Sequence, residues 1–213
     1  MAKPGPRPSL RLTLVRNGAA AATWSLGEGQ VVCGRTEGDV RLPDDATVSP
    51  RHARFTSGDG ALRVDDLGSS NGTFLRLRAA RPVSVGDELR IGRQVLRLEP
   101  LPRPAAVREP RAWGTADRGA RFRLSQLLDG GGTGDVFPLH EGENLVGREA
   151  GDVTFPSDRY VSSRHARIDV RGEALLLTDL GSSNGTFVRI VGAAELAAGD
   201  SLLVGTQLLR VEG

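Results

Sequence analysis

The residues in this chain that could do chemistry are an arginine, serines and an asparagine, each set among glycines. Arg35 follows a glycine at the end of an apolar run, Ser49 begins a Ser-x-x-His segment, and Ser70 and Asn71 precede another glycine. Guanidinium, hydroxyl and amide groups all donate hydrogen bonds, and the two short segments contain no carboxylate. This combination favours binding of an anion, with the amide able to hold a peptide backbone.

The same residues return in the second half of the chain without any slip in register. Arg148, Ser162, Ser183 and Asn184 stand where Arg35, Ser49, Ser70 and Asn71 stand in the first half. The period is far longer than the unit of a solenoid or propeller, so it indicates duplication of a whole domain.

Taken singly, each of these residues has a structural interpretation. Arg35 could be a surface residue at a strand end, and an asparagine before glycine often forms a turn. The tracts between the shared positions differ, as in residues 56–60 against 169–173. Recurrence of the polar set within divergent surroundings favours a functional site.

The elements that position these residues are short strands. Segments rich in Val, Leu, Ile, Phe and Thr alternate with Gly, Asp, Ser, Asn and Pro, and no sustained helical stripe is present. This pattern predicts a β-sandwich or barrel. The predicted strands of the first half are Leu10–Val15, Gln30–Gly34, His52–Phe55, Ala61–Val64, Gly72–Leu77, Glu88–Ile91 and Gln94–Leu98.

The repeat predicts two domains, at residues 9–99 and 121–213. Residues 1–8 contain three prolines and are expected to be a loose tail. Residues 100–120 are rich in Pro, Arg and Ala and are expected to be an exposed linker. Thr115 is the only threonine there and is either a regulatory phosphorylation site or a plain linker residue.

Composition narrows the class of protein. The net charge is only +2, and Lys3 is the only lysine, so the basic pI comes from arginine. Arginines could form a nucleic-acid surface, but few aromatic residues are available for base stacking. Cys33 is expected in the core, without a disulfide. No signal peptide or membrane span is evident, which favours the cytoplasm.

The ordered set Gly-Arg, Ser-x-x-His and Ser-x-Asn-Gly resembles the forkhead-associated (FHA) domain, and it does so twice. The resemblance implies an all-β chain with two β-sandwich domains of about eleven strands each, joined by the Pro/Arg-rich linker. It also implies that loops at one end of each sandwich bind phosphothreonine peptides.

The resemblance carries specific roles over to residues of this chain. In the first domain, the residues expected to bind phosphopeptide are Arg35, Ser49, Arg51, Ser70 and Asn71. In the second domain they are Arg148, Ser162, Ser163, Arg164, Ser183 and Asn184. The residues expected to structure the loops are His52, Gly72, His165 and Gly185.

The expected function is a non-catalytic adaptor in serine/threonine kinase signalling. Its partners would be threonine-phosphorylated proteins, among them a kinase or its substrates, without nucleic acid or membrane insertion. No cofactor or metal is expected, since three His and one Cys are scattered along the chain. Ser49 and His52 alone make no hydrolase triad. The main alternative is a module that binds unphosphorylated protein through its sandwich faces.

The two sites are expected to differ, with the second one stronger. Pro50 in the first has no backbone N–H for a phosphate, whereas Ser163 stands at that position in the second. Arg159 could add a cation and Tyr160 a phenol and a flat wall for the peptide. The opposing interpretation is that the proline only stiffens its loop and Arg159 faces solvent.

Overall fold

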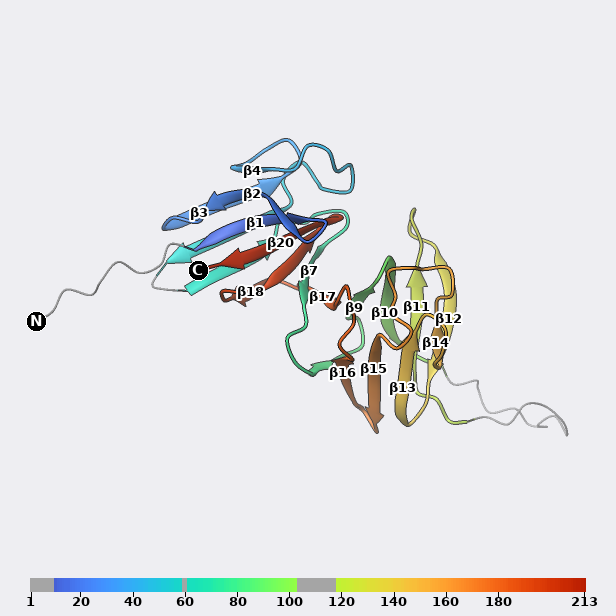
Figure 1. Ribbon diagram of the computed structural model, residues 1–213. Coiled ribbons are helices and arrows are strands. Elements are labelled where there is room, and N and C mark those ends of the chain that lie inside the picture. Colours follow the sequence, from blue (N-terminus) through green and yellow to red (C-terminus); the bar gives the residue numbers. More distant parts are fainter. Residues whose placement is uncertain (1–9, 59–60, 103–117) are drawn as a thin grey trace, which may run out of the picture. The chain divides into compact units, whose positions relative to one another are not determined.

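The computed structural model describes residues 10–58, 61–102 and 118–213, and in these ranges the chain forms twenty strands and no helix (Figure 1). The predicted all-β class is confirmed. The strands of the first repeat match the predicted segments closely, with ten in each half of the chain. The expected tail and most of the expected linker, including Thr115, lie outside the described residues.

The chain divides into two compact units that differ from the two ranges expected from the repeat. Unit 1 comprises Met1–Arg76, of which the part from residue 10 is described, together with Arg189–Gly213. Unit 2 is Leu77–Val188. Each unit therefore takes the last three strands of one repeat and the first strands of the other.

Unit 1 is a sandwich with two layers of five strands each. In one layer the order is β7-β19-β20-β1-β2, and in the other it is β18-β6-β5-β3-β4. The strands of this unit are β1 (Arg11–Arg16), β2 (Ala19–Ser25), β3 (Gly29–Gly34), β4 (Val40–Arg41), β5 (Ala53–Gly58), β6 (Ala61–Asp66), β7 (Thr73–Arg76), β18 (Ala193–Leu196), β19 (Ser201–Val204) and β20 (Gln207–Glu212). Figure 1 shows the red strand β20 of the second repeat beside the blue strand β1.

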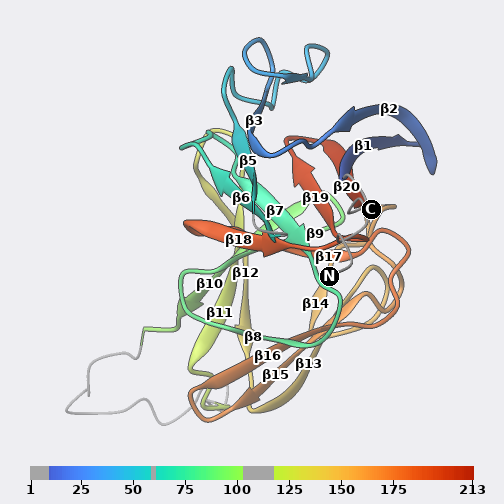
Figure 2. The ribbon, with the colours of Figure 1, turned by 90° about the vertical axis from the view of Figure 1, so that its left-hand side faces the viewer.

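Unit 2 repeats this architecture. Its sheets have the orders β17-β9-β10-β11-β12 and β8-β16-β15-β13-β14. Its strands are β8 (Arg81–Val83), β9 (Glu88–Ile91), β10 (Gln94–Pro100), β11 (Phe122–Leu127), β12 (Thr133–Leu139), β13 (Gly142–Gly147), β14 (Val153–Thr154), β15 (Ala166–Arg171), β16 (Ala174–Asp179) and β17 (Thr186–Arg189). Figure 2 shows the two edge strands that come from the other repeat, β18 beside β6 and β8 beside β16.

The hydrophobic cores follow the units and not the repeats. The core of unit 2 contains Leu89, Leu96 and Leu98, all completely buried, among side chains of the second repeat. The core of unit 1 contains Leu202, Leu209 and Val211 among side chains of the first repeat. A fully buried leucine stabilises a fold by about 1.5–3 kcal/mol, so the exchanged strands contribute substantially to both cores.

The exchange is possible because the two repeats present equivalent strands. In unit 1, Thr73–Leu75 of β7 pair with Leu202–Val204 of β19. In unit 2, Thr186–Val188 of β17 pair with Leu89–Ile91 of β9. Exchange of an identical element costs little free energy, because every strand finds a partner of the same shape and register.

The expected linker consequently joins two strands of one unit. β10 ends at Pro100 and β11 begins at Phe122, and these two residues are paired in the same antiparallel ladder. The chain instead passes between units at residues 77–80, which connect β7 to β8, and at residues 190–192, which connect β17 to β18.

This topology predicts that cutting the chain between its repeats will not separate them. With a protease site inserted within residues 103–117, cleavage should give two fragments that co-elute under native conditions, because each core contains side chains from both. They should separate only in denaturant. Gel filtration of the cleaved protein provides the measurement, and two independently eluting folded fragments would show that each repeat folds by itself.

Candidate functional site

The Gly-Arg pair of each repeat lies where a strand end passes against the serine loop. A Cβ at Gly34 would overlap the carbonyl oxygen of Pro50, so only glycine permits this approach. The backbone N–H of Arg35 then donates to the carbonyl of Ser49 at 2.9 Å. In unit 2 the N–H of Arg148 donates to the carbonyl of Ser162 at 3.0 Å.

A second loop joins this pair through the serine hydroxyl. In unit 1 the N–H of Ser70 donates to Oγ of Ser49 at 3.0 Å, and Nδ2 of Asn71 donates to the carbonyl of Thr47 at 2.7 Å. Because Oγ of Ser49 accepts a hydrogen bond there, its own O–H is left to donate. Arg35 is half-buried, while Ser70 and Asn71 are exposed. We call this cluster site 1.

Unit 2 contains the same arrangement, which we call site 2. The N–H of Ser183 donates to Oγ of Ser162 at 3.2 Å, and Nδ2 of Asn184 donates to the carbonyl of Tyr160 at 2.8 Å. The structure thus brings together the strand-end arginine, the serine and the Ser-Asn pair in both units. The remaining expected residues, Arg51 in unit 1 and Ser163 and Arg164 in unit 2, are exposed on the serine loops.

A completely buried histidine connects the two loops of each site. Nδ1 of His52 accepts the N–H of Ser49 at 3.1 Å, and Nε2 lies 3.1 Å from the carbonyl of Gly72. The first contact requires an unprotonated Nδ1, and the second requires a proton on Nε2, so the ring is neutral. His165 makes the corresponding contacts with Ser162 and Gly185.

An aspartate organises the Ser-Asn-Gly loop from below. The carboxylate of Asp66 accepts hydrogen bonds from the backbone N–H groups of Gly68 and Ser69 and from the hydroxyls of Ser69 and Thr73. Burial opposes its ionisation, but the hydrogen bonds from Thr73 and Ser69 outweigh burial and lower the pKa of Asp66. Asp179 makes the same contacts in unit 2.

Site 2 contains an acidic residue that the sequence analysis missed. Glu149 accepts two hydrogen bonds from Arg148, the shorter at 2.9 Å, and its other carboxylate oxygen lies 3.3 Å from Oγ of Ser163. Thr36 occupies this position in the first repeat. The sequence already showed this carboxylate directly after Arg148, the arginine that is expected to bind phosphate.

The described residues also bear on two other possibilities, a metal site and a membrane-spanning helix. No group of His, Cys, Asp and Glu there could hold a metal ion. None of the described segments is a helix long and apolar enough to cross a membrane. Cys33 is buried in the core of unit 1, and burial raises the pKa of its thiol to about 12.

Comparison with known proteins gives the family. The model of the FHA domain matches residues 31–92 and 144–205. The chain belongs to the FHA domain family. Both matched ranges contain the Gly-Arg, Ser-x-x-His and Ser-x-Asn-Gly residues, so both repeats are FHA repeats.

Curated relatives each align with only part of this chain. An oxoglutarate dehydrogenase inhibitor of Corynebacterium efficiens is 39% identical over 104 residues, which cover 47% of this chain and 71% of that protein. An FHA domain-containing protein, FhaB, of Mycolicibacterium smegmatis is 37% identical over 94 residues, which cover 42% of this chain and 61% of that protein.

Solved FHA structures align along nearly the whole chain. The FHA domain of a Chlamydia trachomatis protein is 12% identical, with a TM-score of 0.41, and the alignment covers 96% of this chain and 97% of that one. An FHA structure described for its phosphothreonine-dependent interactions is 15% identical, with a TM-score of 0.39 and 96% of both chains covered.

The neutral histidines should make the FHA units less stable in mild acid. Burial lowers the pKa of His52 in the folded chain. On unfolding, the pKa returns to about 6.5, so the unfolded chain takes up a proton that the folded chain does not, and stability is lost as pH falls through that value. Urea unfolding between about pH 7.5 and 5.5 should show this loss.

Replacing the imidazole of His52 by a side chain that does not titrate distinguishes its contribution to the pH dependence of stability from that of other groups. His52→Gln should reduce overall stability and also make its pH dependence over this range shallower than in the natural protein. An unchanged slope would mean that His52 does not titrate on unfolding. The chemical shifts of its ring protons, followed against pH in the natural protein, give a second measurement if the variant fails to fold.

Proposed function

We propose that the protein is a non-catalytic adaptor that binds phosphothreonine peptides through two pockets, site 1 and site 2. The observation that carries this proposal is the convergence of the strand-end arginine, the serine hydroxyl and the Ser-Asn pair, built twice with the same hydrogen bonds. Partners would be threonine-phosphorylated proteins, including a serine/threonine kinase or its substrates.

The donors in these sites match a phosphate group. A phosphothreonine has about −1.5 to −2 charge near neutral pH and three acceptor oxygens. Site 1 offers the Arg35 guanidinium and the hydroxyls of Ser49 and Ser70, while its supporting carboxylate, Asp66, is already satisfied by hydrogen bonds within its loop. The exposed Asn71 is available beside them for the peptide backbone.

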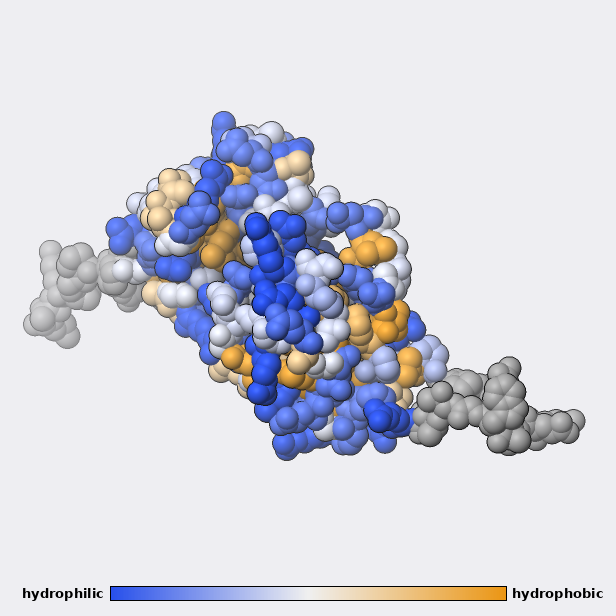
Figure 3. Space-filling view, turned by 45° about the vertical axis from the view of Figure 1, so that its right-hand side comes forward, coloured by the Kyte–Doolittle hydropathy of each residue, from blue (hydrophilic) through white to orange (hydrophobic). Residues whose placement is uncertain are grey.

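A phosphorylation-independent adaptor is the alternative, and it would need an apolar binding face. The exposed large hydrophobic residues among those described are dispersed along the sequence, at Val85, Leu128, Val136, Leu176 and Val191. On the face drawn in Figure 3, apolar residues occur in small groups among hydrophilic ones. A stable protein interface usually has a more continuous apolar centre, so the polar loop sites support the phosphopeptide proposal better.

Binding should depend on the two arginines. Loss of a charge-assisted contact to phosphate costs about 1.5–3 kcal/mol, or roughly ten- to a hundredfold in affinity. Arg35→Ala should weaken binding at site 1 and Arg148→Ala at site 2 by this amount, and the double variant should no longer capture phosphorylated partners. Titration of a phosphothreonine peptide against each folded variant measures the effect.

Lysine variants provide the matched control. Arg35→Lys and Arg148→Lys keep the charge but lose the two-pronged guanidinium geometry, so their affinities should be intermediate. The unphosphorylated peptide should bind none of the proteins. Capture that survives in the double alanine variant, or after phosphatase treatment of the partner, would support the alternative instead.

The two sites should also differ because of Glu149. Its carboxylate occupies Arg148 and Ser163 and must leave before a phosphate binds there. An exposed ion pair is worth about 0–1 kcal/mol, so Glu149→Gln should tighten binding at site 2 by up to about fivefold. The measurement uses Arg35→Ala chains, in which only site 2 keeps its arginine, with Thr36→Gln in an Arg148→Ala chain as the matched control at site 1.

This comparison also tests the expected ranking of the sites. Site 2 has the backbone N–H of Ser163, whereas Pro50 at site 1 has none. Before a ligand binds, however, Arg148 of site 2 is already paired with Glu149. If Glu149→Gln leaves the affinity of site 2 unchanged, the carboxylate does not compete with the ligand.

A further inference from the structure

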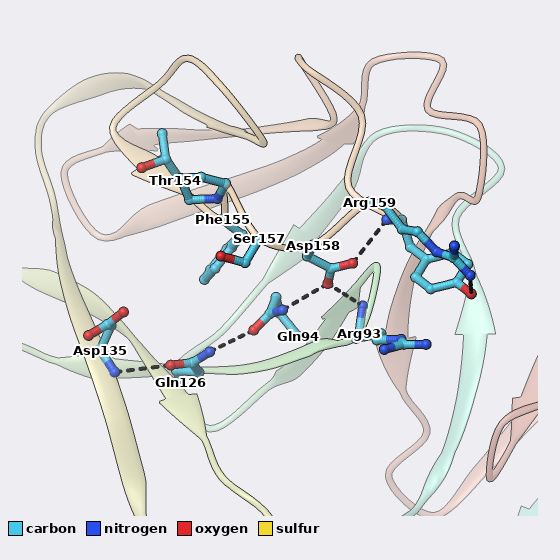
Figure 4. Close-up of a pocket in the computed structure, with 11 residues that line it drawn as sticks. Arg93, Gln94, Gln126, Asp135, Thr154, Phe155, Ser157, Asp158 and Arg159 are labelled. Atoms are coloured by element: carbon cyan, nitrogen blue, oxygen red, sulfur yellow. Dashed lines mark hydrogen bonds between the residues drawn. The ribbon is translucent and has the colours of Figure 1, made fainter.

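A pocket of about 580 Å3 lies in unit 2, beside site 2 (Figure 4). Its walls come from both repeats. Arg93 and Gln94 belong to the turn and strand after β9, which the first repeat contributes to this unit. Phe155, Asp158 and Tyr160 belong to the second repeat, on the segment that leads to Ser162.

The end of this pocket next to site 2 is cationic. The guanidinium carbon of Arg93 lies 4.8 Å from the centre of the Tyr160 ring, and that of Arg159 lies 5.0 Å from it. Arg159 also donates to the Tyr160 hydroxyl at 2.9 Å. Among the described residues, no carboxylate forms an ion pair with either guanidinium. Both arginines are exposed and therefore accessible.

The carboxylate nearest to these arginines is already committed to the fold. Asp158 is buried and accepts hydrogen bonds from the backbone N–H groups of Arg93 and Tyr160 and from the side-chain amide of Gln94. Gln94 in turn accepts from Gln126, which accepts the N–H of Asp135 at the opposite end of the pocket from Arg159 in Figure 4. Asp158 thus fixes the exchanged turn in place, and although its charge interacts with that of Arg93, it forms no ion pair with either guanidinium.

The cationic end is continuous with site 2. Asn184, the residue expected to hold the peptide backbone, donates to the carbonyl of Tyr160. The ring of the same Tyr160 contacts both arginines. A peptide held by Asn184 would therefore place a neighbouring side chain close to Tyr160 and to the two guanidinium groups.

Unit 1 has no such pair of cations at the corresponding positions. Asp45 replaces Asp158, and its carboxylate accepts hydrogen bonds from Thr47, Thr206 and Gln207. Thr206 stands where Arg93 stands, and Ala46 and Thr47 stand where Arg159 and Tyr160 stand. The nearby Arg16 contacts Gln207 and pairs with Asp44 at 3.8 Å.

We propose that Arg93 and Arg159, stacked on Tyr160, form a subsite for an anionic side chain next to the phosphothreonine of the ligand at site 2. This proposal rests on the proposed function. The group recognised is a carboxylate or a second phosphate, since guanidinium binds both. Because Arg93 comes from the first repeat, the subsite exists only where that repeat lends its strands to unit 2.

The test uses full-length chains in which one phosphate arginine is replaced, so that each site is measured alone. An Arg35→Ala chain is titrated with phosphothreonine peptides that have one glutamate placed at each flanking position in turn, against peptides with glutamine there. At the favoured position, glutamate should tighten binding several-fold, since a contact between a carboxylate and an exposed guanidinium adds only modestly to affinity. A third series with phosphoserine there distinguishes a second phosphate from a carboxylate.

Arginine variants assign the preference to the pocket. Arg93→Gln or Arg159→Gln in the Arg35→Ala chain should remove the preference, measured as the ratio of the affinities for the glutamate and glutamine peptides. In an Arg148→Ala chain, which reports site 1, there should be no such preference, and Arg93→Gln should change nothing. A preference at site 1 that depends on Arg93 would overturn the proposal, because the turn would then belong to unit 1.

Tyr160 gives an independent readout, because it is the only tyrosine in the chain. The hydrogen bond from Arg159 lowers the pKa of its phenol, which can be followed by ultraviolet absorbance against pH. A bound anion that draws the guanidinium away should raise this pKa for the glutamate peptide more than for the glutamine peptide.

The outcomes separate the two proposals. Equal binding of glutamate and glutamine peptides at every position, with normal phosphate dependence, would overturn the subsite and leave the phosphothreonine function intact. Absence of phosphate-dependent binding by either single-site chain would overturn the proposed function and the subsite with it.

Discussion

The pairing of β7 with β19 and of β17 with β9 determines the rest of the structure. Through these two ladders each repeat gives its last three strands to the unit of the other. The hydrophobic cores, the edge strands β8 and β18, and the residues beside each site all follow from that choice. The loops that form the sites are unaffected, because each lies within the first strands of its own repeat. The exchange therefore preserves two equivalent FHA sites while mixing the surfaces around them.

Each site has a buried neutral histidine and a hydrogen-bonded aspartate beneath its exposed side chains. His52 and Asp66 make their hydrogen bonds within the two loops, and Ser49 and Asn71 each make one further hydrogen bond between loop segments. Gly34 allows the strand end to approach the serine loop closely. Such a preorganised layer reduces the conformational entropy lost when a ligand binds. Site 2 departs from this plan at Glu149, whose carboxylate accepts hydrogen bonds from Arg148.

Sequence reasoning reached the all-β class and most strands, because alternating apolar segments are a local signal. The polar set repeated in register also pointed to residues that the structure brings together, while their role in binding stays a prediction. The named segments did not include Ala19–Ser25, which is alanine-rich and largely exposed. They also did not include Val40–Arg41 and Arg81–Val83, which are too short for a pattern. Sequence reasoning could not find the exchange. β9 and β19 have leucine and a second apolar residue at the same positions, so the local pattern does not tell which of them pairs with β7. The sequence shows Glu149 directly after Arg148, but only the side-chain geometry shows that the two residues are hydrogen-bonded.

Duplication alone would give two identical specificities, and the exchanged turns are where this chain departs from that outcome. The turn after β9 has Arg93 and packs against Arg159 and Tyr160, whereas the turn after β19 has Thr206 and packs against Asp45 and Thr47. A buried aspartate anchors both turns in the same way, so their side chains can vary without loss of the anchor. The main hydrogen bonds that hold the two turns are the same in both units. A change in the turn that one repeat contributes therefore alters the surroundings of the other repeat's site. The residues around each site must be read from both repeats.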